Sequence, residues 1–243
     1  VCAYYRMLDR LAFNDGAKAC MLALATGTDL DGLGAFWGVA RLVLQEADGN
    51  QVPPVPEILE ADTDFRRRIQ LSLEGHSTAG PRGSYVFWAL SADADVKDAS
   101  VESPNPGEVL VSILSRSGDG TATTALLDTV TAALTADDVR PLTDQVTVQA
   151  ATITTYQVTA SLTLYPGPDE AVVLSAVEDV VNAYVDEHHR LGHDIRLSGL
   201  YAALHQPGVQ AVTLTEPVTD LIIGASEAAH CTAIAIAVGG RDV

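Results

Sequence analysis

Aromatic residues are scarce in this chain: they make up 5% of the sequence, although 47% of its residues are apolar. The hydrophobic cores must therefore be built mainly from Ala, Val and Leu. Basic residues are also few, with 14 Lys and Arg against 32 Asp and Glu, which gives a formal net charge of -18. A surface of that sign repels phosphate groups, so we expect neither nucleic acid nor a membrane surface as a partner.

Cysteines and long apolar runs are equally sparse. Cys2, Cys20 and Cys231 show no Cys-x-x-Cys spacing, which argues against a disulfide framework and fits a reducing compartment. No stretch approaches the ~20 apolar residues that a membrane helix needs. The helical pattern is already under way at Val1 without a signal peptide, so we expect further residues upstream of this chain.

The segment Ala23–Val39 predicts a tight helical hairpin. A first apolar helix, with Tyr4, Met7, Leu8 and Leu11 on one face, is expected to end at Gly27. Thr28 or Asp29 can cap the second helix, because a short polar side chain satisfies the free N–H groups at a helix start. This second helix is expected to stop at Gly38, and its apolar positions are Leu30, Leu33, Phe36 and Trp37.

Downstream of this hairpin, the segment Asp48–Pro56 is rich in turn residues and prolines, and this composition predicts a linker more clearly than any other segment of the chain. Changes of period then predict helices over 62–73, 84–91, 121–136, 169–191 and 198–204. Strands are predicted over 41–45, 96–101, 109–113, 146–150, 155–165, 209–215 and 232–238. The helix capped by Asp169 is the best defined, with apolar residues at three- and four-residue steps: Val172, Val173, Ala176, Val177, Val180 and Tyr184.

An internal echo links the two halves of the chain. Around Val96 and again around Val209, a short apolar helix leads into a strand, a proline turn and a second apolar strand. Unless the two spacings coincide by chance, this echo predicts two related α+β modules. We predict an α+β fold, with a helical N-terminal region followed by two small, mostly antiparallel sheets covered by helices. The predicted domains are a helical region and linker at 1–61, incomplete at its start, and α+β domains at 62–152 and 153–243.

Histidines near the end of the long helix leave a catalytic alternative open. His189 and His193 are four residues apart, as on a zinc-binding helix, so a metal-dependent hydrolase using His188, His189 and His193 is one hypothesis. Gly192 lies between them, however, and the helix dipole alone favours histidine at a helix C-terminus. We therefore expect no metal, no other cofactor and no catalytic residue. A ligand-binding module is a third hypothesis, and it would need a deep pocket with converging polar groups.

Two features suggest contacts with other chains. The arginine run 66–68 fits a solvated helix face, or it pairs with an acidic patch on a neighbouring subunit. The last apolar strand is either core or, if it lies at a sheet edge, a surface for self-association. The candidate interface residues are Arg66, Arg67, Arg68, Ile234, Ile236 and Val238.

A series of short segments resembles the baseplate J-like protein family of contractile phage tails. Each segment alone is of low specificity, but together they follow the family order and span nearly the whole chain. Besides the hairpin at Ala23–Val39, these segments are Phe65–Ile69, Gly80–Tyr85, Val96–Gly107, Val139–Asp144, Tyr165–Pro168, Pro207–Val209 and Gly239–Asp242. The family normally carries several tens of residues ahead of the start of this chain.

The resemblance implies a non-enzymatic scaffold subunit in the baseplate wedge of a P2-like contractile tail. Such a subunit pairs with itself inside each wedge and joins the wedges into a ring around the hub. Its further implied partners are other wedge proteins, the sheath-initiator and hub proteins. The implied location is the virion tail baseplate of a phage or prophage, after assembly in the cytoplasm of the host bacterium.

Overall fold

The computed structural model describes residues 2–77, 79–167 and 169–242. The predicted helix start at Val1 and the end of the predicted turn at Pro168 lie outside these residues, as does the side chain of Cys2. The chain forms two compact units, the first made of residues 1–95, 101–109 and 129–146 and the second of 96–100, 110–128 and 147–243. The three domains predicted from the sequence stay a prediction.

The fold is α+β, as predicted. In chain order, the helices are α1 (Cys2–Ala19), α2 (Gly27–Phe36), α3 (Asp62–Gly75), α4 (Arg82–Ala92), α5 (Thr124–Leu134), α6 (Glu170–His188) and α7 (Leu197–Leu204). The strands are β1 (Val43–Gln45), β2 (Ile58–Leu59), β3 (Val96–Glu102), β4 (Glu108–Ser115), β5 (Gln145–Ala150), β6 (Thr152–Leu164), β7 (Val209–Glu216) and β8 (Glu227–Arg241). Apart from β2, which was not predicted, and the end of α1, the helices and strands occupy the segments whose periodicity predicted them, with boundaries shifted by a few residues.

The predicted hairpin of α1 and α2 needs two corrections. Helix α1 ends at Ala19, well before Gly27, and turn residues follow it. Helix α2 begins at Gly27, so Thr26 precedes it, and its side chain makes no capping hydrogen bond. Capping by Thr28 or Asp29 is therefore wrong, because both residues already lie in the first helical turn.

Helix α2 ends as predicted, because Gly38 has φ 70°, a conformation that favours glycine. The helix packs closely on α3, and Gly34 leaves no room for a side chain at this contact. A Cβ atom at Gly34 would lie 2.5 Å from Cζ of Phe65 and 2.8 Å from the carbonyl oxygen of Val39. The cluster at this contact is Ala25, Leu30, Val39, Phe65 and Ile69.

The segment predicted as a linker is the loop of a small hairpin. Strands β1 and β2 pair antiparallel, and Asp48 and Val55 exchange backbone hydrogen bonds of 3.0 and 2.9 Å within the loop. Next to this hairpin, Arg41 forms ion pairs of 2.8 Å with both Asp31 and Asp62. These contacts connect α2, the hairpin and the start of α3.

A three-stranded sheet with the order β3-β4-β5 follows in the chain. The predicted hairpin around Pro104–Gly107 is confirmed, since β3 and β4 are hydrogen-bonded neighbours. Gly107 has φ 81° in the connecting turn, and the N–H of Glu108 donates to the carbonyl of Asn105 there.

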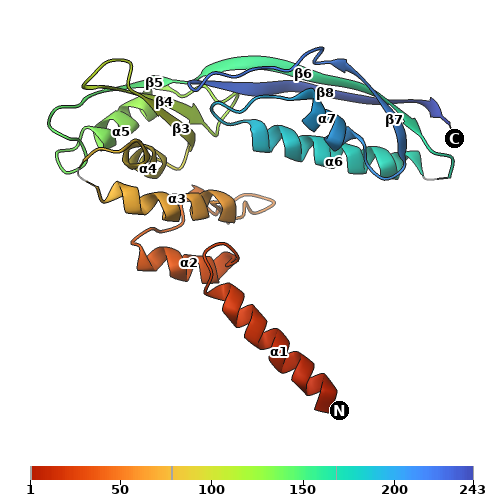
Figure 1. Cartoon of the computed structure of the whole chain (residues 1–243), viewed down its shortest axis with the longest axis horizontal. Helices are drawn as coiled ribbons and strands as arrows, with labels where there is room; N and C mark the ends of the chain where they lie inside the picture. Colours follow the sequence, from red (N-terminus) through yellow and green to blue (C-terminus); the bar gives the residue numbers. More distant parts are fainter. Residues whose placement is uncertain (1, 78, 168, 243) are drawn as a thin grey trace. The chain divides into compact units, whose positions relative to one another are not determined.

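The second unit contains a sheet with the order β7-β6-β8, in which β6 pairs antiparallel with β7 and parallel with β8. Helices α6 and α7 cover one face of it (Figure 1). As predicted, Asp169 caps α6, because its carboxylate accepts hydrogen bonds from the N–H groups of Ala171 and Val172. The most completely buried residues of the core between sheet and helices are Val158, Leu162, Leu164, Val177, Val181, Ile195, Leu200 and Leu204.

The echo between the two modules does not extend to their topology. In the first sheet the two echoing strands, β3 and β4, are neighbours, whereas β6 separates β7 from β8 in the second. A parallel pair requires a long crossover connection, and the segment between β6 and β8 provides it with α6 and α7. Local spacing predicted the strands but not their pairing.

Candidate interaction surfaces

The arginine run lies on α3, and its last member is buried rather than solvated. Arg68 is 4% exposed and forms a bidentate ion pair with Glu60, 2% exposed, through Nε at 2.8 Å and a terminal nitrogen at 2.6 Å. A terminal nitrogen of Arg68 also donates to the carbonyl of Ala40 at 2.7 Å, and the other donates to Ser91 at 3.2 Å. The interpretation as a solvated face is wrong for Arg68.

Arg66 is also engaged within the chain. Its guanidinium donates 2.7 Å hydrogen bonds to the carbonyl oxygens of Leu22 and Ala25, in the turn between α1 and α2. Both carbonyls belong to the turn between α1 and α2, where the sequence had predicted that the first helix continues to Gly27. Arg67 is half-buried. A role for the three arginines at a subunit interface remains a prediction.

The last strand is both at a sheet edge and partly buried, and its role in self-association remains a prediction. Strand β8 is an edge strand of the sheet β7-β6-β8 among the described residues. Its three candidate interface residues are half-buried against the core of the second unit: Ile234, Ile236 and Val238. The alanines between them are exposed on the other face: Ala233, Ala235 and Ala237.

Helix α1 exposes apolar side chains along its length. It extends from the rest of the first unit as a bare helix (Figure 1), and all but one of the residues 3–19 are exposed. The exposed large apolar residues of α1 are Tyr4, Tyr5, Met7, Leu8, Leu11 and Phe13. Exposed apolar surfaces of this kind are typical of interaction sites, because apolar side chains are more stable when they are removed from water. The sequence predicted the apolar face, but not that nothing in the described chain covers it.

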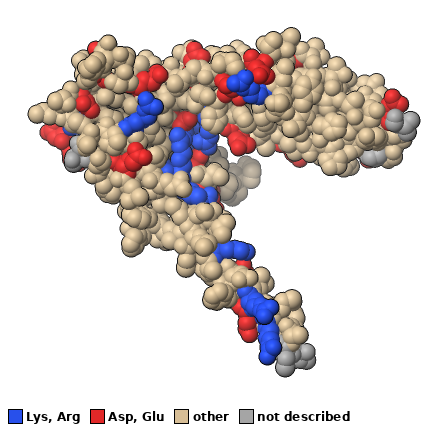
Figure 2. All heavy atoms as spheres, in the orientation of Figure 1, with Lys and Arg blue, Asp and Glu red and all other residues tan. Residues whose placement is uncertain are grey.

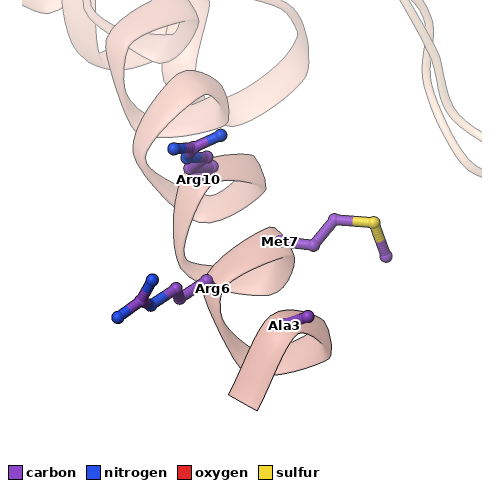
Figure 3. Close-up of a pocket in the computed structure, with 4 residues that line it drawn as sticks. All are labelled: Ala3, Arg6, Met7 and Arg10. Carbon is purple, nitrogen blue, oxygen red and sulfur yellow. The ribbon is translucent and has the colours of Figure 1, made fainter. Parts of the chain in front are cut away.

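A groove of about 350 Å³ runs beside this apolar face, lined by Ala3, Arg6, Met7 and Arg10 (Figure 3). The side chains of Arg6 and Met7 extend from different sides of the helix in this view. On the visible face of α1, Lys and Arg atoms cover more of the surface than Asp and Glu atoms (Figure 2). Helix α1 is therefore both apolar and basic, in a chain that is strongly acidic.

Helix α6 carries two apolar faces, of which only one is in the core. Val173, Val177 and Val181 are buried. The other face is exposed, and its residues are Val172, Ala176, Val180 and Ala183. Three residues of the predicted apolar stripe, Val172, Ala176 and Val180, thus face outward. The apolar stripe is wider than a helix needs to pack on one core. This extra width was the feature of the sequence that could have indicated a second apolar surface on α6.

The histidines of the catalytic hypothesis do not converge. The ring of His188 stacks on Tyr184 with centroids 4.0 Å apart, and His193 meets His188 edge-on at 6.0 Å. His189 instead faces His230, with a centroid distance of 5.4 Å. Within the residues that the structure describes, no group of three His, Cys, Asp or Glu side chains could hold a metal ion.

His189 is held by packing and by one hydrogen bond. Its Nδ1 lies 2.6 Å from the carbonyl oxygen of Ala229, so Nδ1–H donates to that oxygen. Burial lowers the pKa of His189, although this hydrogen bond acts in the opposite direction. Its Nε2 lies against the backbone at Gly120. These contacts fit a neutral, structural histidine.

A polar pocket of about 270 Å³ lies in the first unit, at the start of α4 and the ends of β3 and β4. The hydroxyl of Tyr85 donates a 2.7 Å hydrogen bond to Asp144 there, and burial together with this carboxylate raises the pKa of Tyr85. Its other charged lining residues are Arg82, Glu102 and Glu108. The pocket is smaller than the roughly 300–1,000 Å³ typical of ligand sites.

None of the helices in the described part of the chain has the length and apolar character to cross a membrane.

Comparison with known proteins gives matches along the whole chain. Three family models match in succession: the Baseplate J-like N-terminal domain over residues 1–48, the Baseplate J-like central domain over 77–150, and the Baseplate J-like protein C-terminal domain over 156–237. Baseplate protein J of Escherichia phage P2 is 46% identical over 240 residues, which cover 99% of this chain and 80% of that protein. Among solved structures, a chain of the anti-feeding prophage baseplate matches 75% of this chain, with a TM-score of 0.48 and 12% identity. This chain covers 46% of that one.

Proposed function

The chain belongs to the baseplate J-like family, and from this premise we propose that it is a scaffold subunit that associates with itself and links the wedges of a contractile-tail baseplate into a ring. A structural role in a phage tail baseplate follows from the family itself. The finer proposal depends above all on the close identity with the phage P2 protein over nearly the full chain.

In this proposal the protein acts by presenting rigid surfaces rather than by catalysis. Two compact units of closely packed helices and sheets keep their shape when a neighbour moves, and interfaces between such bodies can switch between discrete arrangements. Its proposed partners are other wedge proteins, the sheath-initiator and hub proteins. Its proposed place of assembly is the cytoplasm of the host bacterium.

A ring of paired subunits needs two different interfaces, one within each pair and one between pairs. The edge strand β8 suits the first of these. Beyond the bridge between Ala228 and Leu191, its outer side pairs with no other strand of the described residues, and a second copy can add its own β8 there. The half-buried Ile234, Ile236 and Val238 would then be covered more fully.

The solution mass of the full chain tests self-association. We expect light scattering to show assemblies larger than one chain, alone or with co-expressed baseplate proteins. A chain that stays monomeric in every mixture contradicts the scaffold proposal. Stoichiometric zinc in the purified protein, together with hydrolytic turnover, would favour the enzyme instead.

A charge at the sheet edge tests the role of β8. The variant Ala235→Lys places a long cation at an exposed position of the edge strand, where charge discourages strand addition. We expect it to abolish pairing through β8 without unfolding the protein. The matched control is Ala211→Lys on β7, an exposed alanine on the opposite edge strand. Equal pairing in both variants would rule β8 out.

A further inference from the structure

We propose that α1 of one copy packs antiparallel on the exposed face of α6 in a second copy. The inference rests on the proposed self-association and assigns the second of its two interfaces. The contact is heterologous, since two different surfaces meet, and such contacts close into rings when the rotation between copies permits.

The apolar surfaces of the two helices are complementary in size. Helix α1 has 18 residues and α6 has 19, so each is about 27–29 Å long at 1.5 Å per residue. On α1, Tyr4, Leu8 and Leu11 fall on one side at helical spacing. On α6, the residues of the exposed stripe, Val172, Ala176 and Val180, are also at helical spacing. Small residues on one helix let the larger side chains of the other approach closely.

Burying its apolar face would also stabilise α1. An isolated helix of this length is only marginally stable in water, because most helical stability in proteins comes from burying an apolar face. In the described chain that face is exposed, with Met7 at 60% and Leu11 at 54%.

Charge favours α6 over other occupants. Helix α1 carries three basic and two acidic residues, whereas α6 carries five acidic residues and no Lys or Arg. Arg6 and Arg10 line the groove beside the apolar face of α1 and pair with no acidic side chain of the described residues. Three of the acidic residues flank the exposed stripe of α6 or continue it, and all are exposed: Asp179, Asp186 and Glu187.

The positions of these charges set the orientation. Arg6 and Arg10 are in the first half of α1, whereas Asp179 is at the middle of α6 and Asp186 and Glu187 are in its last turn, so an antiparallel arrangement brings more of these charges together than a parallel one. The macrodipole opposes carboxylates at the end of α6 and cations at the start of α1. An antiparallel contact relieves both, because each charged end meets a neighbour of opposite sign.

Charge reversal on each helix tests the contact. Variant A is Arg6→Glu with Arg10→Glu, and variant B is Asp179→Lys with Glu187→Lys. Each alone places like charges across the contact, so we expect the dissociation constant for assembly beyond the pair to rise about tenfold or more. An equimolar mixture of A and B restores opposite charges at every contact between A and B, so it should assemble better than either variant alone and approach the wild-type level. Sedimentation of the full chain over a range of concentrations measures these changes.

The control for variant B is Glu178→Lys, which reverses a neighbouring exposed charge about 100° around the helix and away from the stripe. This control should assemble like the wild type. If the wild type assembles and A and B assemble equally well, the helix contact is wrong while self-association stands. If A fails to join other baseplate proteins but keeps its contact with copies of itself, the occupant is another protein and the inference is overturned. A wild type that is monomeric throughout overturns this inference and the proposed self-association together.

Discussion

Replacing Arg68 by Met should destabilise the first unit more than any exposed charge change. The substitution keeps much of the side-chain volume but removes the guanidinium that neutralises Glu60. Glu60 would then keep only a 3.2 Å hydrogen bond from the N–H of Leu42. The carbonyl of Ala40 would also lose its 2.7 Å donor.

The size of the expected loss of unfolding free energy follows from the burial of both side chains. Both members of the pair are at most 4% exposed, so neither charge can regain water without local unfolding. Breaking a buried pair by removing one partner costs about 3–5 kcal/mol of unfolding free energy. The double variant Glu60→Leu/Arg68→Met leaves no charge behind, and replacing both partners of a buried pair is often neutral. It should therefore be more stable than Arg68→Met alone, by at least about 1 kcal/mol.

Tryptophan fluorescence during urea unfolding reports on this unit alone, because both tryptophans, Trp37 and Trp88, lie in it. The control is Lys18→Met, which removes a cation from an exposed ion pair with Asp15 and should change stability by less than about 1 kcal/mol. The reasoning is refuted if Arg68→Met costs no more than this control, or if the double variant is the least stable of the set.

Three further changes test other parts of the structure. Gly34→Ala should cost about 1–3 kcal/mol by overpacking against Phe65, and its unfolding midpoint in urea would show this loss. Tyr156→Phe should raise the unfolding free energy by about 1 kcal/mol, because the buried hydroxyl has no hydrogen-bond partner among the described residues. Burial raises the pKa of Tyr156, so the contribution of this protonation equilibrium to the unfolding free energy is complete below about pH 10 and is lost as the pH rises further. The fall of the unfolding free energy at alkaline pH, measured by urea titration, should therefore be smaller in the Phe variant. Burial lowers the pKa of His189, so the contribution of this histidine to the unfolding free energy is present above about pH 6.5 and decreases as the pH falls. The variant His189→Gln should therefore lose less stability between neutral and acidic pH than the wild type, as measured by circular dichroism.

Local signals in the sequence were sufficient for most elements. Asp169 predicts the start of α6 because capping is a contact between residues two or three apart, and Gly38 ends α2 because its backbone conformation is local. The turn around Pro104–Gly107 joins β3 and β4 for the same reason. The ordered series of short segments also identified the family, which the comparisons confirm.

Contacts between distant residues could not be predicted in this way. An arginine run looks the same whether water or Glu60 neutralises it, so the burial of Arg68 depended on where the fold places Glu60 relative to α3. Which of two apolar faces of α6 enters the core depended on the sheet it covers, and the position of β6 between β7 and β8 depended on chain topology. The sequence by itself determined the local elements and the family, since those depend on neighbours in the chain. Only the tertiary structure decided which charges are buried and which apolar faces stay open, because burial is a property of surfaces that residues far apart form together.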